Sequence, residues 1–152
     1  MNPVVHFEMP YDDPGRMGKF YKDAFGWKTK ALGEKMGNYV TASTSESAPS
    51  GAPTKPGRIN GGFYQRKPEW PEQHPSVVIA VDDIEKSIAK VTSAGGRVLG
   101  EPMDIPGIGA YVSFMDTEGN RVSMLQPSPE MTKEKKPAAK KATAKVKGKS
   151  RR

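Results

Sequence analysis

Cysteine is absent from the 152-residue sequence. Its absence excludes disulfide bonds, thiolate metal sites and cysteine nucleophiles, and it fits a reducing compartment. Histidine is scarce, since His6 and His74 are the two histidines, so little imidazole is present for a metal site. No apolar run approaches the length of a membrane span, and the first ten residues lack the basic start and apolar middle of a signal peptide. We therefore expect a soluble cytoplasmic protein.

Motifs that would name a reaction are also missing. The sequence contains no P-loop, nucleophile elbow or dinucleotide-binding fingerprint. The Gly-x-Gly at Gly107–Gly109 has neither the spacing nor the context of such a fingerprint. Function must therefore be argued from the organisation of the chain.

Positive charge is concentrated at the C-terminal end. Lys133–Arg152 holds ten Lys or Arg residues and one acidic residue, whereas the other 132 residues hold 14 basic and 16 acidic ones. The segment Ser128–Arg152 contains one valine and no aromatic residue, so we predict that it is a disordered tail. A Lys-rich tail of this kind favours nonspecific nucleic-acid binding through phosphates, and a solvated tail with no partner is the alternative.

An internal repeat organises the rest of the sequence. His6–Trp27 and Ser76–Arg97 share one plan: a strand-like run, an Asp-Asp pair, a helix-like run and a glycine. A repeat of this kind predicts two similar modules that share one core. In the first strand, alternation places His6 and Glu8 on the face opposite the apolar residues.

The elements of each half follow the same order. Asp12-Asp13-Pro14 and Asp82-Asp83 are typical helix starts, because a carboxylate there can accept hydrogen bonds from free backbone N–H groups. Both helix-like runs carry apolar residues at helical spacing, and Gly26 and Gly95-Gly96 are expected to end them. The pattern predicts an α+β fold with two βαβββ modules, and its strands are expected over residues 4–9, 27–32, 38–43, 59–66, 76–81, 97–103, 110–116 and 121–126.

The segments between these elements read as loops. Residues 44–58 form a predicted long loop, residues 67–75 a polar connector that joins the two modules, and residues 105–109 a glycine-proline loop. The modules then occupy residues 1–66 and 76–127. His74 lies in the connector and is expected to be solvated.

These elements resemble the glyoxalase/bleomycin resistance protein/dioxygenase superfamily, also called the vicinal oxygen chelate superfamily. The resemblance covers Met1–Pro127 and rests on HFEMPYDDPGRMGKFYKDAFGWK in the first copy and on VDDIEKSIAKVTSAGGRV and MDTEGNRVSMLQP in the second. It implies a curved eight-stranded sheet around a cup, with the helices on the convex side. It also implies a homodimer, in which the modules pair either within one chain or between two chains.

The resemblance further implies that most metal ligands are missing. In metal-using members, the first and last strands of each module supply four side chains to one divalent ion. The corresponding positions are His6, Gly61 or Gly62, Ser76 and Ser123, and only His6 has a matching side chain. Glycine and serine are poor ligands for a transition metal, so we predict no metal cofactor. A weak two-ligand site made by His6 and Glu8 is the alternative.

The cup-facing residues are candidates for ligand contacts. Within this group, His6 and Glu8 are either a proton-carrying pair or a structural hydrogen-bonded pair. We predict a metal-independent protein that binds a partly aromatic small molecule. One alternative is a lyase or isomerase related to lactoylglutathione lyase with a weakly held metal, and another is a dimeric scaffold for a nucleic-acid-binding tail. The candidate ligand-binding residues are His6, Glu8, Gly62, Tyr64, Ser76, Tyr111 and Ser123.

Overall fold

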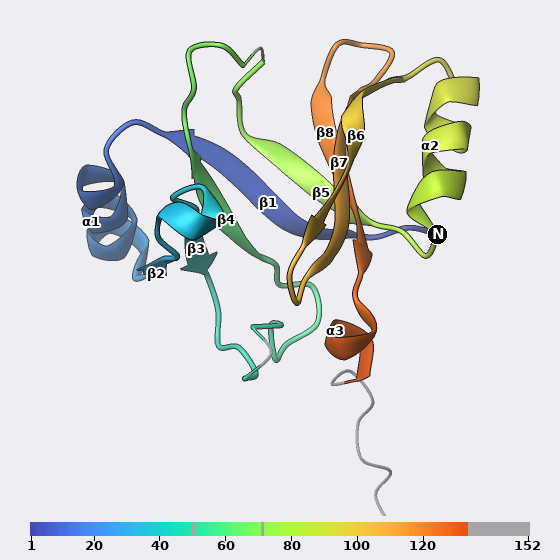
Figure 1. Ribbon diagram of the computed structural model, residues 1–152. Coiled ribbons are helices and arrows are strands. Elements are labelled where there is room, and N and C mark those ends of the chain that lie inside the picture. Colours follow the sequence, from blue (N-terminus) through green and yellow to red (C-terminus); the bar gives the residue numbers. More distant parts are fainter. Residues whose placement is uncertain (50, 71, 134–152) are drawn as a thin grey trace, which may run out of the picture.

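One mixed eight-stranded sheet forms the body of the protein. The structure is a computed structural model that describes residues 1–49, 51–70 and 72–133. The strands lie in the order β2-β3-β4-β1-β5-β8-β7-β6, which confirms the predicted α+β class (Figure 1). The strands are β1 Val4–Tyr11, β2 Lys28–Ala31, β3 Val40–Ser43, β4 Asn60–Gln65, β5 Ser76–Ala80, β6 Arg97–Ile105, β7 Gly109–Met115 and β8 Arg121–Pro127. The helices are α1 Pro14–Phe25, the 3-10 turn η1 Glu34–Met36, α2 Ile84–Ser93 and α3 Pro129–Lys133.

The two modules have the same strand topology. In the first module β1 pairs in parallel with β4, and in the second β5 pairs in parallel with β8. Strands β1 and β5 pair antiparallel at the centre, so the two modules join into one sheet within this chain. The four strands β2, β3, β4 and β1 therefore form one half of the sheet, and β5, β8, β7 and β6 form the other.

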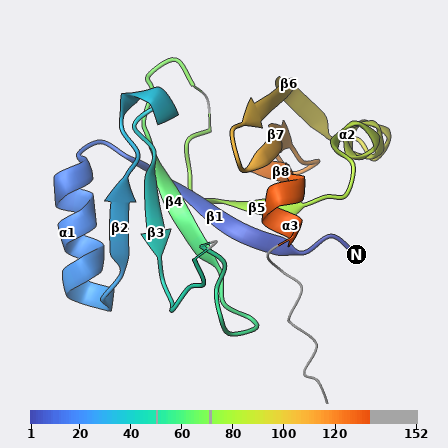
Figure 2. The same cartoon turned by 60° about the horizontal axis from the view of Figure 1, so that its bottom comes forward.

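The helices begin as the sequence predicts. The Asp13 side chain accepts a hydrogen bond from the backbone N–H of Arg16 at 2.8 Å, and Asp83 accepts from that of Lys86 at 3.0 Å. Helix α1 ends at Phe25, and its cap Gly26 has a left-handed φ of 70°. Helix α2 ends one residue earlier than predicted, at Ser93, with Ala94 as its cap. The two helices lie at opposite ends of the sheet (Figure 2).

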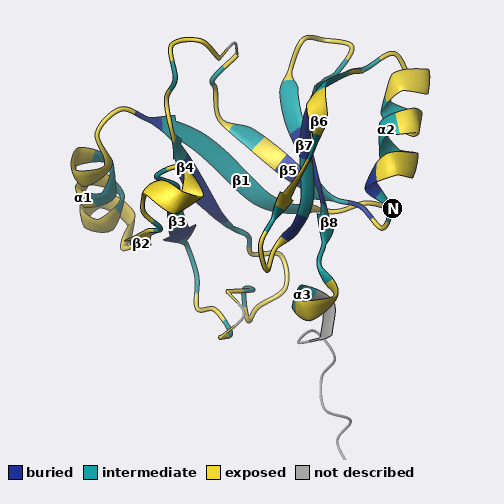
Figure 3. Ribbon diagram, in the orientation of Figure 1, coloured by how far each residue is buried: buried dark blue, intermediate teal, exposed yellow. Residues whose placement is uncertain are grey.

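Each module has its own hydrophobic core, so the prediction of one shared core is wrong. Tyr11, Val40, Ala42 and Phe63 form the first cluster, and residues of α1 pack against it. The second cluster lies under α2 and consists of Val81, Ile84, Val112 and Met124. Figure 3 shows buried residues in both halves of the sheet. They form two clusters because each helix covers only its own half.

The prediction of a disordered tail from Ser128 is wrong over its first residues. Pro129–Lys133 forms α3, where Pro129 is the first helical residue and the Ser128 hydroxyl accepts from the backbone N–H of Met131 at 3.5 Å. The rest of the predicted tail, residues 134–152, lies outside the described residues. The loop predicted over residues 105–109 is shorter, because β6 runs to Ile105 and β7 begins at Gly109. Among the described residues, no helix is long and apolar enough to cross a membrane.

Candidate functional site

Two adjacent glycines in β4 allow an aromatic ring to lie on each face of the first module. A Cβ on Gly61 would overlap the ring of Phe7, and one on Gly62 would overlap the ring of Tyr39. Gly62 pairs in register with Glu8, so Gly62 is the residue that faces the cup. The missing side chain at Gly62 therefore accommodates Tyr39, and the β1–β4 register continues through both glycines without a bulge.

Tyr39 reaches the cup from the position just before β3, the strand next to β4. Thr41 pairs with Gly62, and alternation along the chain places Tyr39 on the same face as Thr41. The Tyr39 hydroxyl lies 2.8 Å from Nε2 of His6 on the central strand β1. Tyr39 was not among the predicted ligand-binding residues, although its hydroxyl contacts one of them, His6.

Tyr111 occupies the equivalent position in the second module. Ser123 pairs with Val78 on β5 and with Ser113 on β7, and Tyr111 lies two residues before Ser113. In the first module, Gly62 pairs with Glu8 on β1 and with Thr41 on β3, and Tyr39 lies two residues before Thr41. The internal repeat therefore places one tyrosine on each wall of the cup, and both hydroxyls point towards strand β1.

The contact between Tyr111 and Glu8 shows how far the sheet curves. Strand β7 is three strands away from β1, which would be about 14 Å in a flat sheet. The Tyr111 hydroxyl nevertheless donates to Oε2 of Glu8 at 2.6 Å. The two side chains meet because both project into the concave face, so Glu8 lies where the two halves of the sheet converge.

A directional chain of hydrogen bonds leads from Arg121 to Glu8. Tyr111 donates its one proton to Glu8, so Ser123 must donate to Tyr111, across 2.7 Å. Ser113 then donates to Ser123 across 3.0 Å, and the guanidinium of Arg121 donates to Ser113 across 3.3 Å. Ser113 and Ser123 are 5% and 1% exposed, so this chain is shielded from water along most of its length. It links a cation at the rim of the cup to a carboxylate on its floor.

Burial shifts the protonation of the floor residues. It lowers the pKa of His6 to about 4, so His6 is neutral at neutral pH. Burial raises the pKa of Glu8, while the hydrogen bond from Tyr111, the charge of Arg121 and a hydrogen bond from Tyr39 act against that rise. The pKa values of Tyr39 and Tyr111 are raised by burial and by the negative charge of Glu8, so both hydroxyls keep their protons.

The donor set does not fit a divalent transition metal. Among the residues that the structure describes, no three His, Cys, Asp or Glu side chains are grouped to hold an ion. Of the four positions implied by the family, His6 offers a ligand, whereas Gly62, Ser76 and Ser123 do not. His6 and Glu8 do not bond each other directly, and each is engaged by a tyrosine hydroxyl. The tyrosine pair thus binds the groups that a metal would need.

The remaining predicted residues lie at the edges of this network. Ser76 pairs in register with Glu8 but forms none of the network's hydrogen bonds, and it also borders a shallow apolar pocket on the opposite face of the sheet. That pocket has a volume of about 300 Å³ and no titratable side chain in its lining. Tyr64 lies two residues after Gly62 and is close enough to Arg121 and Glu8 for their charges to affect its pKa, which burial raises.

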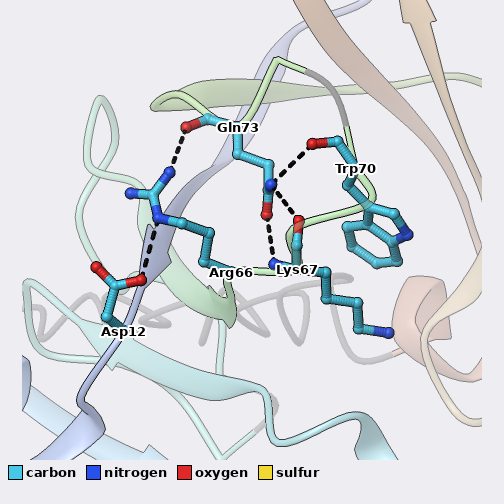
Figure 4. A network of polar contacts seen from close by, with 5 residues as sticks. All are labelled: Asp12, Arg66, Lys67, Trp70 and Gln73. Atoms are coloured by element: carbon cyan, nitrogen blue, oxygen red, sulfur yellow. Dashed lines mark hydrogen bonds and ion pairs between the residues drawn. The ribbon is translucent and has the colours of Figure 1, made fainter.

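Hydrogen bonds hold the described residues of the connector between the modules. Gln73 accepts a hydrogen bond from the backbone N–H of Lys67 and donates to the carbonyls of Lys67 and Trp70, at 2.6–2.9 Å (Figure 4). Arg66 donates to the Gln73 carbonyl at 3.1 Å and to Asp12 at 3.2 Å, which fixes the connector to the body. His74 is exposed, as predicted. Ser113 and Arg121 belong to the hydrogen-bond chain and Trp70 lies beside Arg121, although none of the three was predicted as a site residue.

Comparison with known proteins identifies the family. The sequence profile described as "Glyoxalase/Bleomycin resistance protein/Dioxygenase superfamily" matches residues 4–124. The chain belongs to this superfamily. The match covers both modules of the sheet, so it confirms the resemblance seen in the repeated motifs.

Individual relatives have varied names. A glyoxylase-like domain-containing protein of Didymella fabae is 34% identical over 120 residues, which cover 77% of this chain and 88% of that protein. The anthracycline biosynthesis protein DnrV of Streptomyces peucetius is 26% identical over 119 residues; the match covers 74% of this chain and 42% of DnrV, so this chain spans less than half of DnrV. Methylmalonyl-CoA epimerase from Mycobacterium tuberculosis superimposes with a TM-score of 0.61 at 13% identity, covering 86% of this chain and 91% of the epimerase, and it shares the fold.

Proposed function

We propose that this protein binds a partly aromatic small molecule without a metal, in the cup walled by His6, Glu8, Ser76, Tyr111 and Ser123. The observation that carries the proposal is the 2.6 Å hydrogen bond by which Tyr111, from the wall of the second module, meets Glu8 on the floor of the first. Small-molecule sites combine aromatic walls with a few placed polar groups, and this convergence has both. The relative DnrV is named for the biosynthesis of anthracyclines, which are aromatic compounds.

A thermal-shift screen tests this proposal. The purified full chain is screened against a panel of aromatic metabolites, and each compound that raises the melting temperature is retested on Glu8→Gln and Tyr111→Phe. We expect the shift to be lost in both variants, because each variant removes a polar partner at the floor of the cup. Glu101→Gln is the matched control, since Glu101 is exposed on β6, and it should keep the full shift. A panel with no stabilising compound, or stabilisation that survives in both cup variants, would contradict the proposal.

A second candidate is proton-transfer catalysis by a lyase or isomerase related to lactoylglutathione lyase. It is favoured by the raised pKa of Glu8, because a general acid or base works best with a pKa close to the working pH. In this role Glu8 would take a proton from a carbon next to a carbonyl, and Tyr111 would hold the carboxylate in place. The assay follows conversion of methylglyoxal and glutathione by the metal-free protein. Activity of the wild type that is lost in Glu8→Gln supports this candidate function. A wild type without activity rejects this candidate.

A further inference from the structure

Arg121 lies at the rim of the cup and forms no ion pair with the described residues. It pairs in register with Met115 at the start of β8 and lies on the same face as Ser123, two residues later. Its guanidinium has five N–H donors, of which one donates to Ser113 at 3.3 Å. Among the described residues it has no other hydrogen bond and no carboxylate within 4.0 Å. Most of its donors are therefore available to a ligand.

Trp70 forms an aromatic wall beside this guanidinium. The Cζ atom of Arg121 lies 5.7 Å from the centre of the Trp70 ring, and Nζ of Lys67 lies 4.4 Å from it. The Tyr64 ring lies 6.5 Å from the Trp70 ring at an interplanar angle of 43°. Two cations and two aromatic rings thus meet in one place, and Trp70 is 40% exposed, so its ring surface is partly open to solvent.

The topology of the sheet explains why these groups meet. Tyr64 lies near the end of β4 and Arg121 at the start of β8, and these two ends lie on the same side because the central strands β1 and β5 are antiparallel. The connector leaves β4 on that side, and the hydrogen bonds of Gln73 fold it back on itself. The indole of Trp70 is consequently held between the two modules at the mouth of the cup.

We propose that the mouth of the cup binds the carboxylate of a planar aromatic acid. The guanidinium of Arg121 would take the carboxylate through paired N–H donors, a geometry that suits arginine, and the ring of the ligand would lie against Trp70 and Tyr64. Glu8 on the floor disfavours a second anionic group, so the inner end of the ligand would be neutral or a hydrogen-bond donor. This inference rests on the proposed function and adds to it the charge and orientation of the ligand.

Calorimetric titration of the full chain with two probes tests the site. Cinnamate is a planar aromatic acid, and cinnamamide has the same shape without the charge. We expect cinnamate to bind the wild type about tenfold to a hundredfold more tightly than cinnamamide, because a charge-assisted hydrogen bond contributes that difference. Arg121→Gln should make the two affinities equal, and Arg121→Lys should keep part of the preference. Arg16→Gln is the matched control, since Arg16 is exposed on α1, and it should bind as the wild type does.

A separate variant tests the aromatic wall. Trp70→Leu should weaken both probes by a similar factor, about twofold to tenfold, because the ring contact does not depend on the charge of the ligand. Trp70→Phe should restore most of the affinity. Equal affinity of the wild type for the two probes, a preference that persists in Arg121→Gln, or no cinnamate binding at millimolar concentration would overturn the anionic site. If cinnamamide nevertheless binds and is lost in Glu8→Gln, the anionic site fails while small-molecule binding by the cup stands.

Discussion

Replacing Gly62 by alanine should displace Tyr39 from the floor of the cup. The backbone of Gly62 does not lie in the left-handed region, so alanine is compatible with the local conformation. Its methyl group, however, would lie closer than 3.0 Å to the ring of Tyr39, well inside the normal contact distance of about 3.5 Å. The Tyr39 ring must therefore move away from β4, and the 2.8 Å hydrogen bond between its hydroxyl and His6 is lost.

The size of the effect follows from these two losses. Forcing an extra methyl group into packed surroundings costs about 1–3 kcal/mol, and the lost hydrogen bond adds about 1 kcal/mol. We expect Gly62→Ala to lower the free energy of unfolding by about 2–4 kcal/mol and the melting temperature by about 5–15 °C. Urea denaturation measures the first quantity and calorimetry the second. Gly15→Ala is the matched control, because a Cβ at Gly15 meets only an Asp13 oxygen at an ordinary 3.4 Å.

A double-mutant cycle decides whether the ring is the cause. In a Tyr39→Ala background the space above Gly62 is empty, so Gly62→Ala should then cost less than about 1 kcal/mol. A cost that is the same in both backgrounds would refute the argument that Gly62 is a glycine in order to accommodate Tyr39. Unchanged stability of the single variant Gly62→Ala would refute it as well.

Three further results are expected. Burial lowers the pKa of His6 from its ordinary 6.5 to about 4, so between these pH values the unfolded chain binds a proton that the folded chain does not. As the pH falls through this window, the wild type should lose about 3 kcal/mol of stability relative to His6→Asn. Urea denaturation at several pH values measures this difference. Adding zinc, nickel, manganese or iron(II) should leave the melting temperature unchanged, and micromolar binding of any of them would contradict the prediction that the protein binds no metal. Deleting residues 134–152, which hold nine Lys or Arg residues, should abolish salt-sensitive retention on DNA without changing the melting temperature, and equal retention of the shortened chain would reject a nucleic-acid-binding tail. Homodimer formation also stays a prediction, and sedimentation measures it.

Local signals explain why most of the fold could be predicted from the sequence. Asp13 and Asp83 cap their helices with side chains that bond the backbone three residues later, and strand alternation needs only neighbouring residues. The short helix after Ser128 was missed because the composition of the whole tail outweighed its local Ser-Pro start. The split into two cores depends on how much of the sheet each helix covers. Sequence periodicity gives no information on that coverage.

The site was harder to predict, because its contacts join residues far apart in the chain. Glu8 and Tyr111 are 103 residues apart, and only the curvature of the sheet brings them together. Tyr39 could have been found by aligning the two modules strand by strand, since it is then the counterpart of Tyr111. No such pattern marks Trp70, whose position depends on the hydrogen bonds that Gln73 makes within the connector.

The presence of two cores has a consequence for how the molecule unfolds. Each module buries its own apolar cluster, and the modules are joined by the β1–β5 pairing and by side chains that cross the cup. The coupling between the modules therefore depends on backbone pairing and polar contacts rather than on a shared apolar cluster. A molecule held between the tyrosines of both walls would add to that coupling. Occupancy of the cup would then sharpen the melting transition as well as raise its midpoint, so cooperativity of unfolding reports directly on binding.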